Sequence, residues 1–189
     1  MFIQTEATPN PEVLKFLPGR EVMGEGSRDF RDADEAAASP LAGALFEVEG
    51  VVRVFFGQDF VTVGKTPSAD WGHLKAPILA AIMDHFTSGL PLFEDAAGAA
   101  GHDAGVYEGE TAQIVAEIKD LLDKRIRPAV AQDGGDILFS RFEADTGVVW
   151  LHMRGACSGC PSSSATLKAG VENMLKHYVP EVTRVEQAL

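Results

Sequence analysis

Two cysteines, Cys157 and Cys160, are the only thiols of the chain and lie two residues apart in the segment GACSGCP at residues 155–161. Thiolates at this spacing can hold one soft metal centre from the same side. A tetrahedral sulfur site or an iron-sulfur cluster, however, usually takes four protein ligands. One chain therefore supplies half of such a site. The simplest completion is a second copy of the chain across a two-fold axis, which predicts a homodimer when the metal is bound.

Three kinds of protein use a Cys-x-x-Cys pair: dithiol oxidoreductases, zinc-bridged structures and iron-sulfur proteins. A thioredoxin-like fold has several strands and a cis-proline after the motif, whereas 29 residues follow Cys160. A zinc site within one chain needs a second Cys or His pair, and the five histidines form no compact pair in the sequence. A metal carrier without enzymatic activity is our first interpretation, and a dithiol oxidoreductase and a structural zinc-bridged dimer stay open as alternatives.

The surroundings of the pair favour ligation. We expect the loop to connect the end of a strand to the start of a helix, where unpaired N–H groups and the helix dipole favour the thiolate. Glycine, alanine and serine fill the loop, so its backbone can approach bridging sulfides and donate hydrogen bonds to them. We also expect the pair near the surface, where an acceptor thiolate can displace one of the ligands.

Composition excludes several classes of partner. The chain of 189 residues has 16 basic and 28 acidic side chains and a net charge of −12, which argues against a nucleic-acid surface. No apolar run reaches the roughly 20 residues that span a bilayer, and the first residues do not resemble a secretory signal. These features predict a bacterial cytoplasmic protein, or one of the mitochondrial matrix if the chain has been processed.

A linker divides the chain. Residues 94–107 are rich in Ala and Gly and have no strand or helix periodicity, so we expect a flexible segment with an end-to-end distance of about 20 Å. It separates a first domain at 1–93 from a second at 108–189. We expect an α+β protein built of two small domains that each resemble an α/β sandwich.

In the first domain, the sequence predicts strands at 2–7 and 13–17 and a hairpin of 51–56 with 60–63. Ser39 followed by Pro40 predicts the start of one helix, and Asp70 predicts the start of another, in which Pro77 marks a kink or the true beginning. The acidic run at 29–35 is interpreted as a solvated face.

The second domain has the predicted order αββαβ. Thr111 is expected to cap the first helix, and strands are expected at 137–142, 148–154 and about 182–186. A helix follows the cysteine loop and ends at Pro180. The segment Asp133-Gly134-Gly135-Asp136 is interpreted as a turn that uses the positive φ of glycine, rather than as a pair of metal-binding carboxylates.

Both domains contain motifs of known families. The second domain resembles the NifU C-terminal domain through Arg127-Pro128, Asp133-Gly134-Gly135-Asp136-Ile137, the 155–161 segment, Thr166-Leu167-Lys168 and Pro180-Glu181-Val182. The first resembles the Nfu N-terminal domain through Thr8-Pro9-Asn10-Pro11, residues 14–19, Ser39-Pro40-Leu41 and residues 54–63. Together the two resemblances cover nearly the whole chain.

The resemblance implies an iron-sulfur cluster scaffold or carrier. Such a protein would bind a [4Fe–4S] cluster between two protomers through Cys157 and Cys160 and transfer it to apo iron-sulfur clients, after receiving it from upstream assembly proteins. The first domain has no ligand set of its own, so we expect it to recognise partners.

Overall fold

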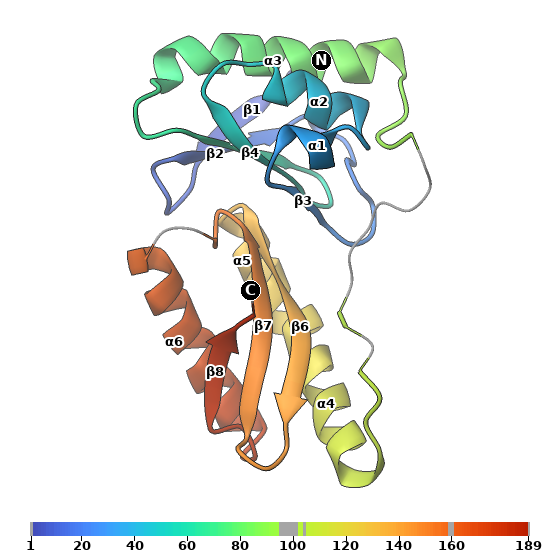
Figure 1. Cartoon of the computed structure of the whole chain (residues 1–189), viewed down its shortest axis with the longest axis vertical. Coiled ribbons are helices and arrows are strands. Elements are labelled where there is room, and N and C mark those ends of the chain that lie inside the picture. Colours follow the sequence, from blue (N-terminus) through green and yellow to red (C-terminus); the bar gives the residue numbers. More distant parts are fainter. Residues whose placement is uncertain (1, 95–101, 104, 159–160, 189) are drawn as a thin grey trace. The chain divides into compact units, whose positions relative to one another are not determined.

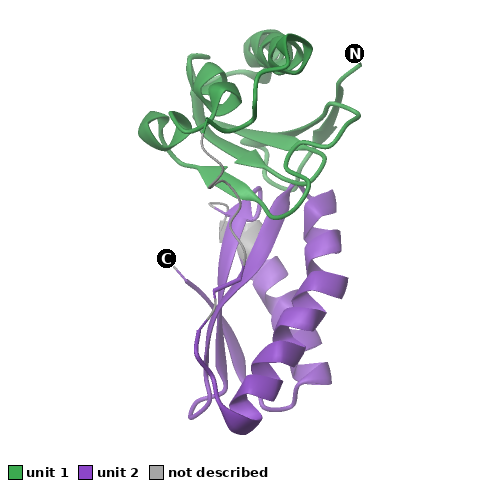
Figure 2. Ribbon diagram, turned by 90° about the vertical axis from the view of Figure 1, so that its right-hand side faces the viewer, with its two compact units in different colours: residues 1–100 green, residues 101–189 purple. Residues whose placement is uncertain are grey.

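The computed structural model describes residues 2–94, 102–103, 105–158 and 161–188, apart from the side chains of 161–164. The chain divides into two compact units, residues 1–100 and 101–189 (Figures 1 and 2). Each unit has its own apolar core. Because helices pack on a sheet in both units, the expected α+β class is confirmed.

The first unit contains a five-stranded antiparallel sheet with the order β1-β2-β5-β4-β3. The strands are β1 (Gln4–Ala7), β2 (Val13–Leu17), β3 (Arg28–Phe30), β4 (Val51–Phe56) and β5 (Val61–Lys65). The predicted hairpin is confirmed as β4 and β5, whose turn is closed by a hydrogen bond from Gly57 N to Phe60 O at 2.9 Å. Runs of β-branched and aromatic residues on either side of a turn thus identified these strands correctly.

Helices cover one face of this sheet (Figure 1). They are α1 (Ala33–Ala36), α2 (Pro40–Phe46) and α3 (Trp71–Ser88). Both predicted caps are confirmed, since Ser39 Oγ accepts from Ala42 N at 3.3 Å and Asp70 Oδ1 accepts from Gly72 N at 2.6 Å. Pro77 neither starts nor ends α3, which continues through it to Ser88.

The acidic run at 29–35 is only partly the solvated face that we expected. Asp29 belongs to edge strand β3, and its side chain is 5% exposed. The Arg53 guanidinium on β4 donates to both carboxylate oxygens of Asp29, at 2.9 and 2.6 Å. Asp32 caps α1 by accepting from Glu35 N at 2.8 Å. Three-residue β3 and four-residue α1 are too short for their periodicity to be recognised in the sequence.

The second unit begins with three consecutive helical segments: α4 (Gly109–Leu121), a π-helical turn η1 (Leu122–Ile126) and α5 (Arg127–Gln132). The predicted cap at Thr111 is wrong, because α4 starts two residues earlier and its N-cap residue, Glu108, makes no side-chain capping bond. The π turn rotates the following residues relative to an uninterrupted α-helix. It precedes Arg127, which is central to the site described below.

A three-stranded sheet completes the second unit in the order β6-β7-β8. Strands β6 (Gly135–Glu143) and β7 (Val148–Gly155) are antiparallel, whereas β8 (Arg184–Gln187) runs parallel to β7. Helix α6 (Pro161–Tyr178) connects β7 to β8, as a parallel pair requires. The predicted order αββαβ is therefore correct.

The predicted linker at 94–107 lies partly outside the described residues, but its final part is ordered against the second unit. Asp103 N donates to Phe139 O at 2.9 Å, and Phe139 N donates to His102 Nδ1 at 2.7 Å. The Tyr107 hydroxyl accepts from Phe142 N at 3.0 Å. Residues 102–103 and 105–107 thus cover the free edge of β6, which would otherwise expose unpaired backbone groups. For these residues the expected flexibility is wrong.

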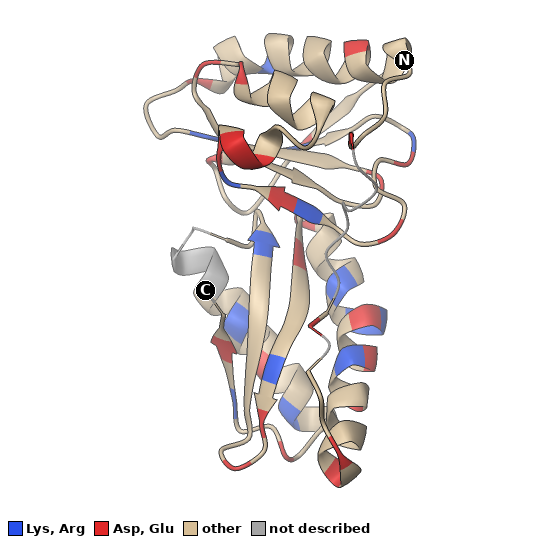
Figure 3. Cartoon of the chain, turned by 45° about the vertical axis from the view of Figure 1, so that its right-hand side comes forward, with Lys and Arg blue, Asp and Glu red and all other residues tan. Residues whose placement is uncertain are grey.

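Acidic and basic residues are interspersed along the helical part of the second unit (Figure 3). Lys124 pairs with Asp120 at 2.6 Å and Arg127 pairs with Asp123 at 2.8 Å, both one helical turn apart. Basic charge on this face is therefore locally compensated. Among the described residues, no helix has the length and apolar character needed to span a membrane.

Candidate functional site

The cysteine loop follows β7 directly and leads into α6, as expected. Its first half is tied to the chain by backbone hydrogen bonds from Ala156 N to Gly134 O at 3.1 Å, from Cys157 N to Arg154 O at 3.4 Å and from Ser158 N to Gly155 O at 3.2 Å. The first of these joins the loop to the turn before β6. Cys160 lies outside the described residues, so the site is described from Cys157.

The turn at Gly134 and Gly135 forms the support under Cys157. Gly134 has φ of 80°, which confirms the predicted glycine turn. Gly135 is needed for a different reason. A Cβ at this position would overlap the Cys157 sulfur and lie 2.7 Å from Arg154 O. The missing side chain therefore provides the space that the Cys157 thiol occupies.

Cys157 is 5% exposed and belongs to the apolar core of the second unit. The expected surface position is wrong for this residue in the single chain. The reason is local: Gly135 has no side chain, and Ala156 is small and only 3% exposed, so the loop folds close over the sheet. An uncharged thiol can pack there as a small hydrophobic group.

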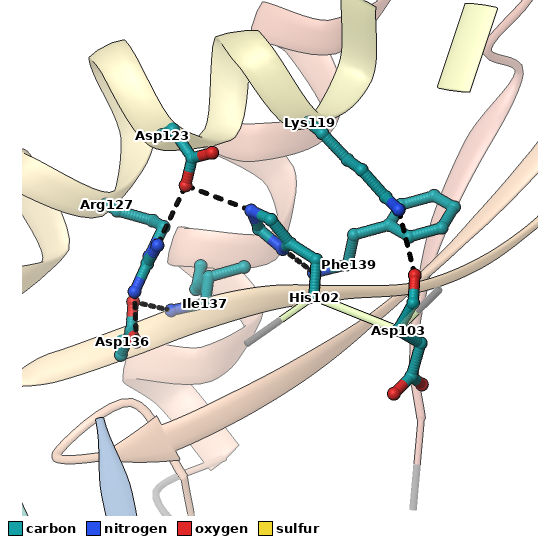
Figure 4. A network of polar contacts seen from close by, with 8 residues as sticks. All are labelled: His102, Asp103, Lys119, Asp123, Arg127, Asp136, Ile137 and Phe139. Atoms are coloured by element: carbon teal, nitrogen blue, oxygen red, sulfur yellow. Dashed lines mark hydrogen bonds and ion pairs between the residues drawn. The ribbon is translucent and has the colours of Figure 1, made fainter. Parts of the chain in front are cut away.

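An ion pair fixes the start of β6 next to this support (Figure 4). Arg127 donates from Nε to Asp136 Oδ1 at 2.8 Å and from Nη2 to Asp136 Oδ2 at 3.0 Å. Asp136 is 6% exposed and also accepts from Ile137 N at 2.8 Å. The hydrogen bond with Asp136, opposed by burial, raises the pKa of Arg127, so the guanidinium stays charged. The ion pair therefore fixes the position of Asp136, the residue that directly follows Gly135.

The network continues from Arg127 to the residues that cover β6 (Figure 4). Asp123 Oδ1 accepts from Arg127 at 2.8 Å and lies 3.0 Å from His102 Nε2. His102 Nδ1 accepts from Phe139, so the ring hydrogen is on Nε2 and points to Asp123. Burial opposes the effect, but the hydrogen bonds from Arg127 and His102 lower the pKa of Asp123. Polar contacts thus extend continuously from Asp136 to His102.

The thiol of Cys157 is a donor that suits a thiophilic metal centre. Cys157 lies at a strand-to-helix loop between two small neighbours, Ala156 and Ser158. Across the described part of the chain, no group of three or more His, Cys, Asp or Glu side chains is placed to hold a metal ion.

The sequence identified the cysteines but missed their support. Arg127 and Asp136 lie nine positions apart in the sequence and on different elements, so no periodicity connects them. Gly135 was grouped with Gly134 as a turn glycine, although its role is to leave space for Cys157. The one sequence feature that pointed to this support was the motif Asp133-Gly134-Gly135-Asp136 at the start of a strand. It indicated a constrained turn and did not reveal what packs on it.

Comparison with protein families gives two matches. The family described as scaffold protein Nfu/NifU N terminal matches residues 3–89, and the NifU-like domain matches residues 118–186. These ranges fall in the two units separately.

Similar proteins extend over almost the full chain. NifU-like protein 4, mitochondrial, and NifU-like protein 5, mitochondrial, of Arabidopsis thaliana are 56% and 55% identical over 187 residues, or 99% of this chain. A 55% identical relative from Drosophila willistoni is named NFU1 iron-sulfur cluster scaffold homolog, mitochondrial. The chain spans 66%, 68% and 63% of the lengths of these three curated relatives.

A solved structure is similar to part of the chain. The solution structure of a NifU-like protein from Saccharomyces cerevisiae has 27% sequence identity and a TM-score of 0.46. The match covers 50% of this chain and 86% of that one.

The expectation of a bacterial cytoplasmic protein is wrong, because the relatives at 55–56% identity are named mitochondrial. The amino-acid composition of the chain could not distinguish the two compartments. A targeting segment is read by an import receptor and leaves no signature in the packing of the folded domains.

Proposed function

Because the chain belongs to the Nfu/NifU-like scaffold family, we propose that it is an iron-sulfur cluster scaffold and carrier of the mitochondrial matrix. Two protomers hold one [4Fe–4S] cluster through Cys157 and Cys160 of each chain and pass it to apo iron-sulfur proteins. The cluster is the cargo, and the protein has no catalytic turnover of its own. Upstream assembly proteins supply the cluster.

The observation that carries the proposal is the position of Cys157 on its glycine support. The thiol lies at the strand-to-helix loop, and the absence of a side chain at Gly135 leaves the space that the thiol occupies. Described residues of one chain offer no complete ligand set around it. A second protomer is the simplest source of the missing thiolates, and it supplies the same soft donors.

Burial of Cys157 suggests how cargo is exchanged. The sulfur packs in the core, where limited exposure protects it from oxidants. Loading requires this side chain to leave the support and bind iron as a thiolate. During delivery, an acceptor thiolate forms a bond to iron as the Cys157 thiolate leaves it, and the released sulfur regains a proton and its apolar contacts. Return to the core thus favours release.

Anaerobic reconstitution with iron and sulfide tests the proposal. We expect a brown homodimer with about four irons per dimer, and loss of both colour and dimer in Cys157→Ser and in Cys160→Ser. A metallated monomer would contradict shared ligation. A colourless protein that reduces a test disulfide catalytically would indicate the dithiol oxidoreductase. Stoichiometric zinc in the purified dimer would indicate the structural alternative.

A further inference from the structure

The first unit contains a groove that the cluster chemistry does not use. It lies between α2 and α3, has a volume of about 830 Å³ and is open to solvent. Apolar or small residues form much of the lining: Pro40, Ala44, Val48, Pro77, Ala80 and Ala81. The core-facing residues of the same helices, such as Leu41 and Ile78, are fully buried. The groove therefore lies on the side of the helix pair that faces away from the sheet.

Hydrogen-bond acceptors dominate the polar groups of the groove. Glu47, Glu49 and Asp84 line it, are exposed and form no ion pair with another described residue. The described lining includes no Lys or Arg. Pro77 has no N–H, so the carbonyl of His73 one turn earlier, which also lines the groove, lacks its usual intrahelical donor. The surface is complementary to a cation.

His85 is an independent sign of a missing ligand. It lines the groove and is 5% exposed, and its Nε2 is buried without a hydrogen-bond partner among the described residues. Burial, with a smaller effect from the charge of Arg20, lowers the pKa of His85, so the ring is neutral. An unpaired buried nitrogen is costly and rare in folded proteins. A bound group that pairs with this nitrogen would remove the cost.

The shape of the groove indicates the kind of ligand. Its α3 side runs from His73 to Ser88, with Pro77, Ala81 and Asp84 between them at helical spacing. At 1.5 Å per residue this stripe is about 22 Å long, which matches about four turns of a second helix. Small side chains at Ala44, Ala80 and Ala81 allow close approach. A long, open, apolar groove with an acidic margin suits an amphipathic helix better than a small molecule.

We infer that the groove between α2 and α3 binds an amphipathic helix of a partner protein, with the apolar face of that helix on the alanines and its Lys or Arg side chains on the acidic margin. The inference deepens the proposed function and rests on it, because such a helix would belong to a client or an assembly protein. The first unit thus contributes the docking site and the second unit contributes the cluster.

The test uses the full chain and a fluorescein-labelled 18-residue helix of Leu and Lys arranged with one apolar face. Fluorescence anisotropy should show saturable binding, with at least tenfold weaker binding of a scrambled peptide of the same composition. Ala80→Trp fills the groove and should weaken binding at least tenfold. Ala76→Trp is the matched control, since Ala76 is exposed on α3 outside the described lining.

Charge reversal separates docking from general attraction to an acidic protein. Glu47→Lys with Asp84→Lys should weaken binding at least tenfold. Asp34→Lys with Glu117→Lys changes the net charge equally at exposed positions outside the groove and should leave most of the affinity. Equal loss in both double variants would overturn the inference, as would no binding to the wild-type chain. Concentration-dependent self-association that Ala80→Trp abolishes would assign the groove to a second copy and overturn it too.

Cluster loading is measured on the same variants. Ala80→Trp should take up iron and sulfide as the wild type does, because the groove contains no cluster ligand. If the wild type failed to take up the cluster, the proposed function would be refuted, and the peptide-binding result could still be interpreted. Normal loading without peptide binding would refute the docking site alone.

Discussion

Both units contain a bidentate Arg–Asp pair with similar geometry, yet the two pairs support different features. In the first unit, Arg53 holds Asp29 at 2.9 and 2.6 Å and fastens edge strand β3 to β4. In the second unit, Arg127 holds Asp136 at 2.8 and 3.0 Å and fixes the turn under Cys157. Both carboxylates are buried, with side chains 5% and 8% exposed.

The difference teaches that a stabilising contact acquires a functional role through its neighbours. Asp29 lies on the edge strand β3 of the first unit, whereas the expected cluster ligands belong to the second unit. Asp136 follows Gly135, whose missing Cβ accommodates the Cys157 sulfur. Arg127 also extends the contact through Asp123 to His102. Removing the arginine from either pair should therefore lower the stability of the two units by similar amounts. Iron-sulfur cluster loading should respond differently to the two substitutions.

The largest expected effect comes from removing either arginine. Arg53→Leu and Arg127→Leu each remove the bidentate partner of a buried carboxylate and should destabilise their own unit by about 3 kcal/mol. Asp29 then keeps a 3.4 Å contact with the exposed side chain of Arg31. Iron loading should fall in Arg127→Leu and persist in Arg53→Leu under conditions where both are folded. Full loading in folded Arg127→Leu would show that the turn needs no such support.

The two tryptophans allow each unit to be followed separately in these variants. Denaturant unfolding monitored by Trp150 in a Trp71→Phe background reports the second unit. The converse background, Trp150→Phe, reports the first. A destabilisation confined to the unit that carries the substitution is the expected pattern, and simultaneous unfolding of both would contradict independent cores.

Gly135→Ala should have the next largest effect. The added methyl group overlaps the Cys157 sulfur, so we expect a loss of about 2 kcal/mol in the second unit and impaired iron loading. Gly170→Ala is the matched control, because a Cβ there meets nothing within 4 Å inside α6. The control should gain about 0.5–1 kcal/mol from helix propensity and load normally. Chemical denaturation and iron counting measure both.

Tyr107→Phe tests whether residues 102–107 belong to the second unit. It removes the hydroxyl that accepts from Phe142 N and should cost that unit about 1 kcal/mol. Tyr178→Phe is the comparison, because its hydroxyl bonds to Arg125 in an exposed position and should be close to neutral. Equal stability of the two variants would mean that the segment contributes nothing to the fold.

The smallest effect concerns the first unit and pH. Because burial and Arg20 lower the pKa of folded His85, the unfolded chain binds more protons at this site. The stability that His85 contributes is present above its unfolded pKa of about 6.5 and is lost as the pH falls through the lower folded value. His85→Phe should therefore reduce the slope of unfolding free energy against pH below about 6.5. An unchanged slope would show that His85 does not titrate differently on folding.

Local patterns predicted most elements because their causes are local. Runs of β-branched and aromatic residues next to breaker or turn residues gave β2, β4 and β5, and the Ser39-Pro40 pair gave the start of α2. Short β3 and α1 were missed because elements of three and four residues show no periodicity, and β3 is held by a contact between Asp29 and Arg53, 24 positions later in the sequence. Residues 102–103 and 105–107, which cover β6, were interpreted as linker because they show no periodicity and because the residues that His102 and Tyr107 contact lie 37 and 35 positions away in the sequence.

The sequence by itself determined the cysteine pair, the order of helices and strands in the second unit and the membership of both units in their families, because these follow from residue identity and short spacing. Only the tertiary structure decided that Cys157 is buried, that Gly135 leaves its space and that Arg127 fixes the turn through Asp136. Those properties arise where separate segments meet. Packing and ion pairing act between atoms that are close in space, however far apart they lie along the chain.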